Sequence, residues 1–246
     1  MSKNILGIIP ARMGSTRFPG KPLKYILNKP MIQWVYENAK KSKLLNDLIV
    51  ATDSKEILNQ VISFGGKALM TKETHSTGLD RVIEVSEIYN TFDHYINIQG
   101  DEPGIHPDTI DGIIKTLQNK ANCEIATAAI QFTQWSNFIN PHQVKVVFNS
   151  DHKALYFSRS AIPYRADEGN LKQSYKHLGI YGYTKNALCV IKELKTGSLE
   201  SLEKLEQLRM LENGMNIFIY ITQHDSVGVD TPEDIPRAET FLKLIM

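Results

Sequence analysis

Three basic residues, Arg12, Arg17 and Lys21, stand close together directly after an apolar stretch that ends at Pro10. No acidic residue occurs among the first 36, so their charge is not neutralised by sequence neighbours. The same segment contributes hydroxyl donors, and glycines that can adopt positive φ angles and approach a ligand closely. These residues are Gly14, Gly20, Ser15 and Thr16. The combination predicts a loop that binds a polyphosphate.

The spacing of this loop differs from the common phosphate-binding motifs. The run GSTRFPGK has the length of a P-loop, but Lys21 is followed by Pro22 instead of Ser or Thr, and no G-x-G-x-x-G occurs. A basic surface turn is the alternative interpretation. We favour an anion site because the loop follows a buried strand, and ligands of α/β sheets bind at the carboxyl ends of strands.

A carboxylate, Asp101, follows a second apolar run, HYINIQ, within the sequence QGDEP that begins at Gln99. At the carboxyl end of a central strand, Asp101 would face the same crevice as the basic loop. A solvated acid in a turn is the alternative. Beside a phosphate-binding loop, this carboxylate is better explained as a Mg²⁺ ligand.

The elements that must position these residues follow a β-α-β-α-β order. Strands are expected at 5–9, 48–53 and 68–70, with amphipathic helices between them that begin at Pro30 and Ser54. This order predicts an α/β fold with a parallel sheet covered by helices on both faces. From Gln134 the rhythm breaks into short strand-like runs, which we interpret as an inserted substrate lobe. A helix is expected at 202–211 and a final strand at 216–222.

The run GVDTPED, at 228–234, predicts the start of the last helix. Asp230 or Thr231 would cap it, Pro232 would occupy its first turn, and the acids that follow suit the positive end of the helix dipole. Capping alone is therefore sufficient to explain Asp230.

Composition excludes several classes of protein. With 28 basic and 27 acidic residues, the net charge of +1 indicates neither nucleic-acid binding nor adsorption to an anionic membrane. Only two cysteines occur, which indicates neither a disulfide framework nor a cysteine metal site. No apolar stretch approaches the ~20 residues that span a bilayer. We expect a cytoplasmic protein.

Eight motifs, in order along almost the whole chain, resemble the 3-deoxy-manno-octulosonate (Kdo) cytidylyltransferase family, also called CMP-Kdo synthetases. They are IIPAR…STRFPGKPL at the start, ATD at 51–53, QGDEP at 99–103, NP…VKVV at 140–147, YFSR at 156–159, HLGIYGY at 177–183, LEQLR at 205–209 and GVDTPED near the end. The individual motifs are weak signals. Their order and spacing together are highly specific.

The resemblance implies a single nucleotidyltransferase domain over residues 1–246. It implies a mixed, mainly parallel sheet related to the glycosyltransferase-A type, with an inserted lobe at 134–215 for sugar binding and dimerisation. A homodimer that uses CTP and Mg²⁺ is also implied. The expected reaction joins CTP to an acidic 3-deoxy ketose and releases pyrophosphate, because the anomeric hydroxyl attacks the α-phosphorus in line.

The resemblance also assigns roles to charged and polar residues of this sequence. The residues implied for CTP are Arg12, Lys21, Arg81 and Gln99. The Mg²⁺ ligands implied are Asp101 and Asp230, which with Arg12 and Lys21 form the catalytic set. The residues implied for the sugar are Arg159, His177, Tyr181, Glu206 and Gln207. A Kdo pocket needs one fixed cation and several hydrogen-bonding groups, and this set supplies both.

One segment departs from the family pattern. In HSTGLDR, Leu79 and Asp80 stand where the family usually has Thr and Glu. The substrate could therefore be 8-amino-8-deoxy-Kdo, whose amine would gain from a nearby carboxylate. An acylneuraminate cytidylyltransferase is a more distant alternative, and a catalytically inactive nucleotide-sugar-binding protein is an alternative from another class.

Overall fold

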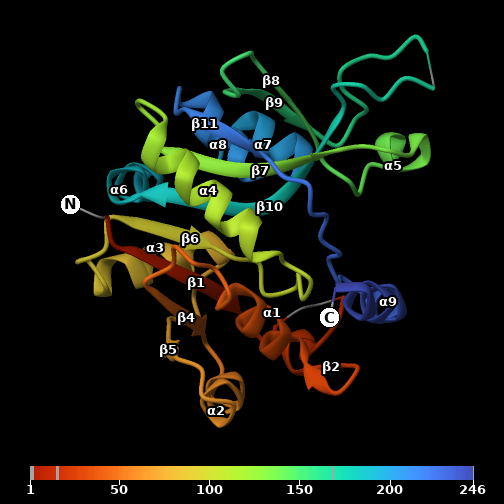
Figure 1. The fold of residues 1–246 in the computed structure, drawn as a ribbon. Coiled ribbons are helices and arrows are strands. Elements are labelled where there is room, and N and C mark those ends of the chain that lie inside the picture. The colour runs from red at the N-terminus through yellow and green to blue at the C-terminus, as the bar shows by residue number, and fades with distance from the viewer. Residues whose placement is uncertain (1–2, 15–16, 168, 246) are drawn as a thin grey trace. The chain divides into compact units, whose positions relative to one another are not determined.

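The computed structural model describes residues 3–14, 17–167 and 169–245 (Figure 1). The chain forms two compact units. Unit 1 comprises Met1–Asp111 and Asp225–Met246, and unit 2 comprises Gly112–His224. The segment 134–215, predicted as an inserted lobe, lies inside unit 2; its roles in sugar binding and dimerisation stay predictions. Among the described residues, none of the helices has the length and apolar character needed to cross a bilayer.

Unit 1 contains a parallel sheet in the order β6-β1-β4-β5. The strands are β1 (Ile5–Ala11), β4 (Asp47–Thr52), β5 (Ala68–Met70) and β6 (His94–Asn97). Four consecutive described strands of one unit are thus parallel, which confirms the predicted sheet. In β1, Leu6 and Ile8 lie on one face of the strand and Ile9 lies on the other. All three are completely buried, so both faces of this strand are covered.

Helices connect these strands. They are α1 (Met31–Ala39), α2 (Lys55–Ser63) and α3 (Gly78–Ile88), followed by α4 (Pro107–Asn119), which contains the division between the units. As predicted, Ser54 caps α2 by accepting hydrogen bonds from Glu56 N and Ile57 N. Ile57 and Val61 of this helix are completely buried, whereas the neighbouring Ile62 is exposed.

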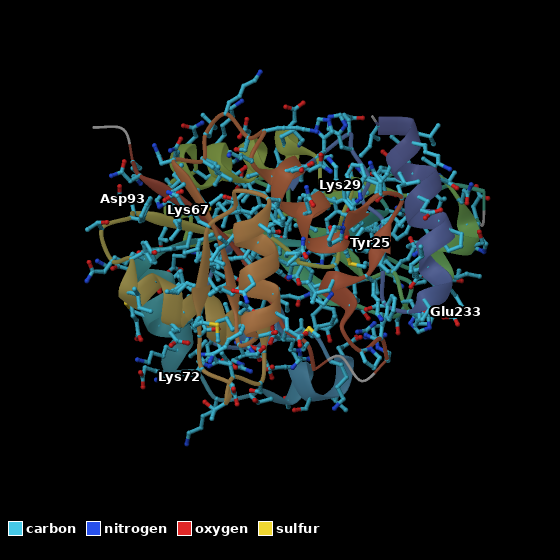
Figure 2. All side chains as sticks on the ribbon, turned by 90° about the horizontal axis from the view of Figure 1, so that it is seen from below. Tyr25, Lys29, Lys67, Lys72, Asp93 and Glu233 are labelled. Carbon is cyan, nitrogen blue, oxygen red and sulfur yellow. The ribbon has the colours of Figure 1, made fainter. Side chains whose placement is uncertain are left out.

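The C-terminal segment packs against the start of the chain within unit 1. It forms a 3₁₀ turn, η2 (Pro232–Asp234), and α9 (Ile235–Ile245), while the N-terminal part contributes η1 (Lys21–Leu23) and the short strands β2 (Tyr25–Ile26) and β3 (Lys29–Pro30). Figure 1 shows α9 in blue beside β2 in orange-red. Figure 2 shows Tyr25 and Lys29 on this hairpin, with Glu233 at the start of the C-terminal helical segment. A shared apolar cluster joins Phe18, Trp34, Val229 and Leu242.

Unit 2 has a mixed sheet. Strand β7 (Ile125–Gln131) pairs in parallel with β11 (Ile217–Ile221) and antiparallel with β10 (Tyr175–Thr184). A hairpin of β8 (Lys145–Phe148) and β9 (Ala154–Ser158) extends from β10. Glycine at 112 allows the Tyr220 ring of β11 to pack closely on α4, since a Cβ there would lie 2.2 Å from that ring unless the ring moved.

The helices of unit 2 differ from the prediction in two ways. They are α5 (Trp135–Ile139), α6 (Lys185–Glu193), α7 (Ser198–Glu203) and α8 (Gln207–Glu212). The helix predicted at 202–211 is present as two helices instead of one, since Lys204 has a left-handed backbone (φ 56°) that ends α7 before α8 begins. Helix α6 lies in a region that was expected to hold only short strand-like runs.

Candidate active site

The basic loop leaves the carboxyl end of β1 and closes on itself. Gly20 has φ 68°, and its backbone N–H donates to Met13 O at 3.2 Å. Phe18 is buried in the apolar cluster of unit 1 and anchors the loop. The prediction of a positive φ angle is confirmed at Gly20 and is wrong at Gly14, whose φ lies outside the left-handed region. Ser15 and Thr16, predicted as donors, lie outside the described residues.

Lys21 lies between two carboxylates. Its ammonium nitrogen is 2.7 Å from Asp101 Oδ2 and 3.5 Å from Asp230 Oδ1, and its side chain is only 13% exposed. Arg17 reaches the same Asp230 oxygen at 3.1 Å from the exposed side. Two of the three cations of the loop, Lys21 and Arg17, are thus paired with acids 80 and more than 200 positions away.

Close backbone packing positions the two carboxylates. Gly100 lies against the end of β1, where a Cβ would be 2.7 Å from Pro10 O. The Asp101 carbonyl accepts a hydrogen bond from Val229 N at 2.9 Å, which brings Asp230 beside Asp101. Because the ends of β1 and β6 meet at one edge of a parallel sheet, the chain can assemble this site from distant segments.

The start of the last helix fixes Asp230. Asp234 Oδ2 accepts from Asp230 N at 2.9 Å and from Thr231 N at 3.1 Å, and Thr231 forms a capping box with Asp234. Thr231 therefore caps the turn, and the Asp230 side chain points to the basic residues instead. Of the two predicted caps, Asp230 and Thr231, it is Thr231 that caps the helical turn.

A pocket of about 280 Å³ collects the residues predicted for the nucleotide and the metal. It is lined by Pro10, Ala11, Arg12, Arg17, Lys21, Pro22, Gly78, Arg81, Gln99, Gly100, Asp101 and Asp230. All six residues of those two predicted sets therefore share one cavity of unit 1. Three basic side chains of the loop and two carboxylates face a common space, which is the arrangement needed to bind a polyphosphate with a cation.

Arg81 also forms buried hydrogen bonds and an ion pair with residues of two other segments of unit 1. Its side chain is 2% exposed; Nη2 pairs with Asp53, and Nη1 donates to Thr71 Oγ1 at 2.7 Å and to Lys72 O at 3.2 Å. Asp53 was not predicted as a site residue. Asp53 directly follows β4, and Arg12 directly follows the neighbouring parallel strand β1. Both residues therefore lie at the same edge of the sheet, and this position could have identified Asp53 as a site residue.

The HSTGLDR segment supports the basic loop. Arg12 Nη1 donates to Ser76 O at 3.2 Å. The departure at position 80 has a local role, because Asp80 Oδ2 accepts from Thr77 N at 2.9 Å in a capping box at the start of α3. Leu79 is buried and packs as a core residue. Both departures thus have a structural explanation within unit 1.

The residues predicted for the sugar all lie in unit 2. The His177 and Tyr181 ring centroids are 5.4 Å apart, and the Phe157 ring centroid lies 4.9 Å from that of His177. They remain on one face of β10 although the register shifts between Leu178 and Tyr181. Burial is the main cause that raises the pKa of Tyr181 well above its ordinary value.

His177 is a neutral side chain with a defined tautomer. Burial lowers its pKa from 6.5 to about 3. Thr127 Oγ1 lies 3.0 Å from His177 Nε2 and donates its single proton to Ile180 O at 2.7 Å. When this proton lies on a carbonyl, either Ile180 O or Leu178 O at 3.2 Å, the hydroxyl accepts from Nε2–H, and Nδ1 is then the acceptor nitrogen of the imidazole.

Arg159 follows β9 and is held by backbone groups. Its Nε donates to Glu203 O at 2.7 Å, and its Nη1 donates to Pro141 O at 3.2 Å. Its backbone N–H donates to the Glu203 carboxylate at 2.8 Å. These contacts fix the guanidinium, and no carboxylate within the described residues forms a salt bridge with it, so its charge remains available to an anion.

Glu206 and Gln207 stand at the start of α8. Gln207 is 5% exposed, and its Nε2 has no hydrogen-bond partner within the described part of the chain. A buried donor without an acceptor is costly unless a ligand supplies one. A mostly buried fork, in which Arg209 Nε and Nη2 both lie 2.7 Å from Glu200, holds α8 against α7.

Comparisons with known proteins agree with this geometry. The family model described as cytidylyltransferase matches residues 6–217. A 3-deoxy-manno-octulosonate cytidylyltransferase from Leptospira biflexa is 47% identical over 99% of this chain and 98% of its own length. An 8-amino-3,8-dideoxy-manno-octulosonate cytidylyltransferase from Shewanella pealeana is 46% identical over 97% and 98%.

A solved structure extends this likeness to three dimensions. CMP:2-keto-3-deoxy-manno-octonic acid synthetase, complexed with CTP, is 38% identical with a TM-score of 0.92, covering 99% of this chain and 100% of that one. The predicted nucleotidyltransferase fold is therefore confirmed. The chain belongs to the cytidylyltransferase family, among the 3-deoxy-manno-octulosonate cytidylyltransferases.

Proposed function

We propose that this enzyme transfers the cytidylyl group of CTP to the anomeric hydroxyl of Kdo, forming CMP-Kdo and pyrophosphate. The observation that carries the proposal is the pocket of unit 1, where Lys21 contacts both Asp101 and Asp230 and Arg12 lines the same space. Basic side chains recognise the phosphates, and the carboxylates suit a divalent cation. The family relationship indicates cytidylyl transfer, and the charged residues of this pocket suit that reaction.

The basic residues act on the phosphates. Arg12 offers a planar guanidinium for two phosphate oxygens, while Lys21 provides a compact charge deeper in the pocket. As pyrophosphate leaves, negative charge accumulates on its oxygens, and positioned cations stabilise that charge more than they stabilise bound CTP. Arg81 and Gln99 line the same pocket and are assigned to the cytidine.

The donor set fits Mg²⁺. Asp101 and Asp230 both reach one cation, the Lys21 ammonium, and hard carboxylate oxygens are the ligands that Mg²⁺ prefers. We assign the metal to these two residues. When bound, the ion would polarise the α-phosphate and lower the pKa of the attacking hydroxyl.

The sugar residues of unit 2 supply one cation and mixed hydrogen-bonding groups. Arg159 would receive the Kdo carboxylate, and Gln207 Nε2 offers a donor that lacks an acceptor in the described chain. His177 would accept from a sugar hydroxyl through Nδ1, with Tyr181 and Glu206 completing the set.

The 8-amino sugar is a second candidate, favoured by the similarity to the Shewanella pealeana enzyme. The argument from Asp80 is weakened because its carboxylate already accepts from Thr77 N. The decisive measurement is pyrophosphate release with CTP and Mg²⁺, comparing Kdo, its 8-amino analogue and N-acetylneuraminate. Preference for Kdo supports the main proposal, preference for the amino sugar replaces it, and activity with none of them refutes both.

Asp101→Asn tests the metal assignment, since it keeps the size of the side chain and removes its charge. We expect turnover to fall by about a hundredfold or more, with a higher Mg²⁺ requirement. Asp47→Asn is a matched control, because Asp47 also pairs with a lysine, Lys67, at 2.8 Å, on the surface of unit 1. Normal turnover and Mg²⁺ dependence in Asp101→Asn would show that the metal assignment is wrong.

Two further features complete the proposal. We assign the enzyme to the cytoplasm, where CTP is made. We also propose a homodimer, supported by the exposed apolar side chains of Leu155, Tyr164 and Leu202 in the segment 134–215. Light scattering of the purified enzyme tests the dimer, and a monomeric mass would refute it.

A further inference from the structure

Lys145, in the VKVV motif of β8, is a lysine that the reaction described above does not use. Its side chain is completely buried in unit 2. Lysine is almost never fully buried without partners, because transferring an ammonium out of water is costly. The burial of this residue therefore requires a specific compensating environment.

Three backbone carbonyls provide that environment. The Lys145 ammonium donates to Asn140 O at 2.9 Å, to Gln143 O at 2.8 Å and to Arg159 O at 2.5 Å. An ammonium has three N–H donors, so every donor is used. Two of the acceptors belong to the loop between α5 and β8, and the third belongs to the residue that follows β9.

The carbonyls of the 140–143 loop lie next to a group that holds the Arg159 guanidinium, and the third carbonyl belongs to Arg159 itself. Lys145 holds the main chain of Arg159 directly. It also holds residues 140 and 143 on either side of Pro141, whose carbonyl accepts from Arg159 Nη1 at 3.2 Å. Glu203 provides a second support, since its carboxylate accepts from the backbone N–H of Arg159 and its carbonyl accepts from Nε. Removing Lys145 would take one donor from each of these three partly buried carbonyls, of which Asn140 O would keep the hydrogen bond from Gln143 N, and would loosen one of these two supports.

We propose that Lys145 is a positioning residue for the sugar site: its buried ammonium orders the loop at 140–143 and the backbone of Arg159 so that the guanidinium can receive the sugar carboxylate. The sugar-binding part of this inference rests on the proposed function of Arg159. The ordering of Arg159 by Lys145 does not depend on it.

Protonation of Lys145 matters for this arrangement. Burial lowers the pKa of Lys145 to about 8; the charge of Glu203 opposes the shift and that of Arg159 adds to it. A neutral amine has only two N–H donors, so one of the three carbonyls loses its hydrogen bond to Lys145 when the proton leaves. High pH should therefore weaken sugar binding selectively.

Lys145→Met tests the inference, because it keeps the chain length and removes the charge and the donors. We expect the KM for the ketose acid to rise about tenfold or more, with the KM for CTP changed by no more than about twofold. Lys120→Met is the matched control, since Lys120 donates to Asp151 O at 3.2 Å on the surface of the same unit. Equal losses for both substrates would overturn the inference.

A double-mutant cycle with Arg159→Ala separates positioning from an independent contribution. If Lys145 acts through Arg159, the double variant should bind the ketose acid as weakly as Arg159→Ala alone. If the double variant binds the ketose acid more weakly than Arg159→Ala by the factor that Lys145→Met causes alone, the inference is overturned. If Arg159→Ala leaves the KM for the sugar unchanged, the proposed sugar role of Arg159 fails, and the positioning claim is then judged from the structure of the side chain.

The Arg159 Nε–H resonance provides that structural readout, assigned by its absence in Arg159→Lys. Lys145→Met should shift or broaden this signal, while an unchanged signal would refute the ordering of Arg159 by Lys145. Should Lys145→Met fail to fold, the wild-type enzyme supplies the test. Between about pH 7 and pH 9.5, the KM for the ketose acid should rise and that for CTP should not. A flat sugar KM, or a parallel rise, would overturn the inference.

Discussion

Acid should destabilise unit 2 through His177. Because burial lowers the pKa of this imidazole from 6.5 to about 3, the unfolded chain binds more protons than the folded chain between these values. The free energy of unfolding therefore has its full value above about pH 6.5 and falls as the pH drops toward 3. Each pKa unit is worth about 1.4 kcal/mol, so the complete loss is roughly 5 kcal/mol, and the loss between pH 7 and 4.5 is roughly 3 kcal/mol.

His177→Gln isolates this contribution, since an amide N–H can still donate to Thr127 but does not titrate. Urea unfolding at pH 7 and pH 4.5 would follow Trp135 fluorescence in a Trp34→Phe background, because the chain has two tryptophans and Trp135 lies in unit 2. Wild type should lose roughly 3 kcal/mol more than His177→Gln over this interval. His142→Gln, at an exposed histidine of unit 2, should retain the wild-type loss. Equal losses in wild type and His177→Gln would refute the reasoning.

Two further predictions concern the scaffold. Gly100→Ala should cost about 1–3 kcal/mol of unfolding free energy and raise the KM for CTP, because its Cβ would lie 2.7 Å from a backbone oxygen of β1. Gly14→Ala, whose Cβ meets no atom of the described residues within 4 Å, is the control and should change stability by no more than about 0.5 kcal/mol. Glu200→Gln should cost about 3 kcal/mol by removing the negative charge that lies 2.7 Å from the mostly buried Arg209 guanidinium. Glu193→Gln, on the exposed face of α6, should be nearly neutral in the same denaturation experiment, and equal costs would contradict the role of the fork.

The sequence was most informative where residues directly follow strands of a parallel sheet. Arg12 follows β1 and Asp101 comes shortly after β6, so their convergence follows from topology and a short distance along the chain. Asp230 could not be placed in this way, because capping explained its motif equally well. Its position depends on the contact between Val229 N and Asp101 O, across more than 100 residues. The family resemblance supplied this residue, and local physical reasoning did not.

The same limit applies to the buried cations. Arg81 was assigned to the nucleotide from the resemblance, but its bonds to Asp53 and Thr71 depend on three segments that only the fold brings together. Lys145 resembles an ordinary solvent-exposed lysine at the start of a strand. Its burial becomes evident only when the carbonyls of Gln143 and Arg159 are located in space. Hydrogen bonds to backbone carbonyls leave no pattern in the types of the residues that supply them.

The error at 202–211 has a related cause. Leu205 and Leu208 continue a helical spacing across the break, so periodicity alone predicts one continuous helix. The break at Lys204 allows Glu203 to bind the backbone N–H and Nε of Arg159 while Glu200, in the same short helix, binds Arg209 on α8. A straight helix would continue the segment along one axis, so Glu203 and Arg209 could not both reach these partners. Long-range contacts therefore override the local preference at a residue that is not glycine, and they do so beside the side chains assigned to the sugar.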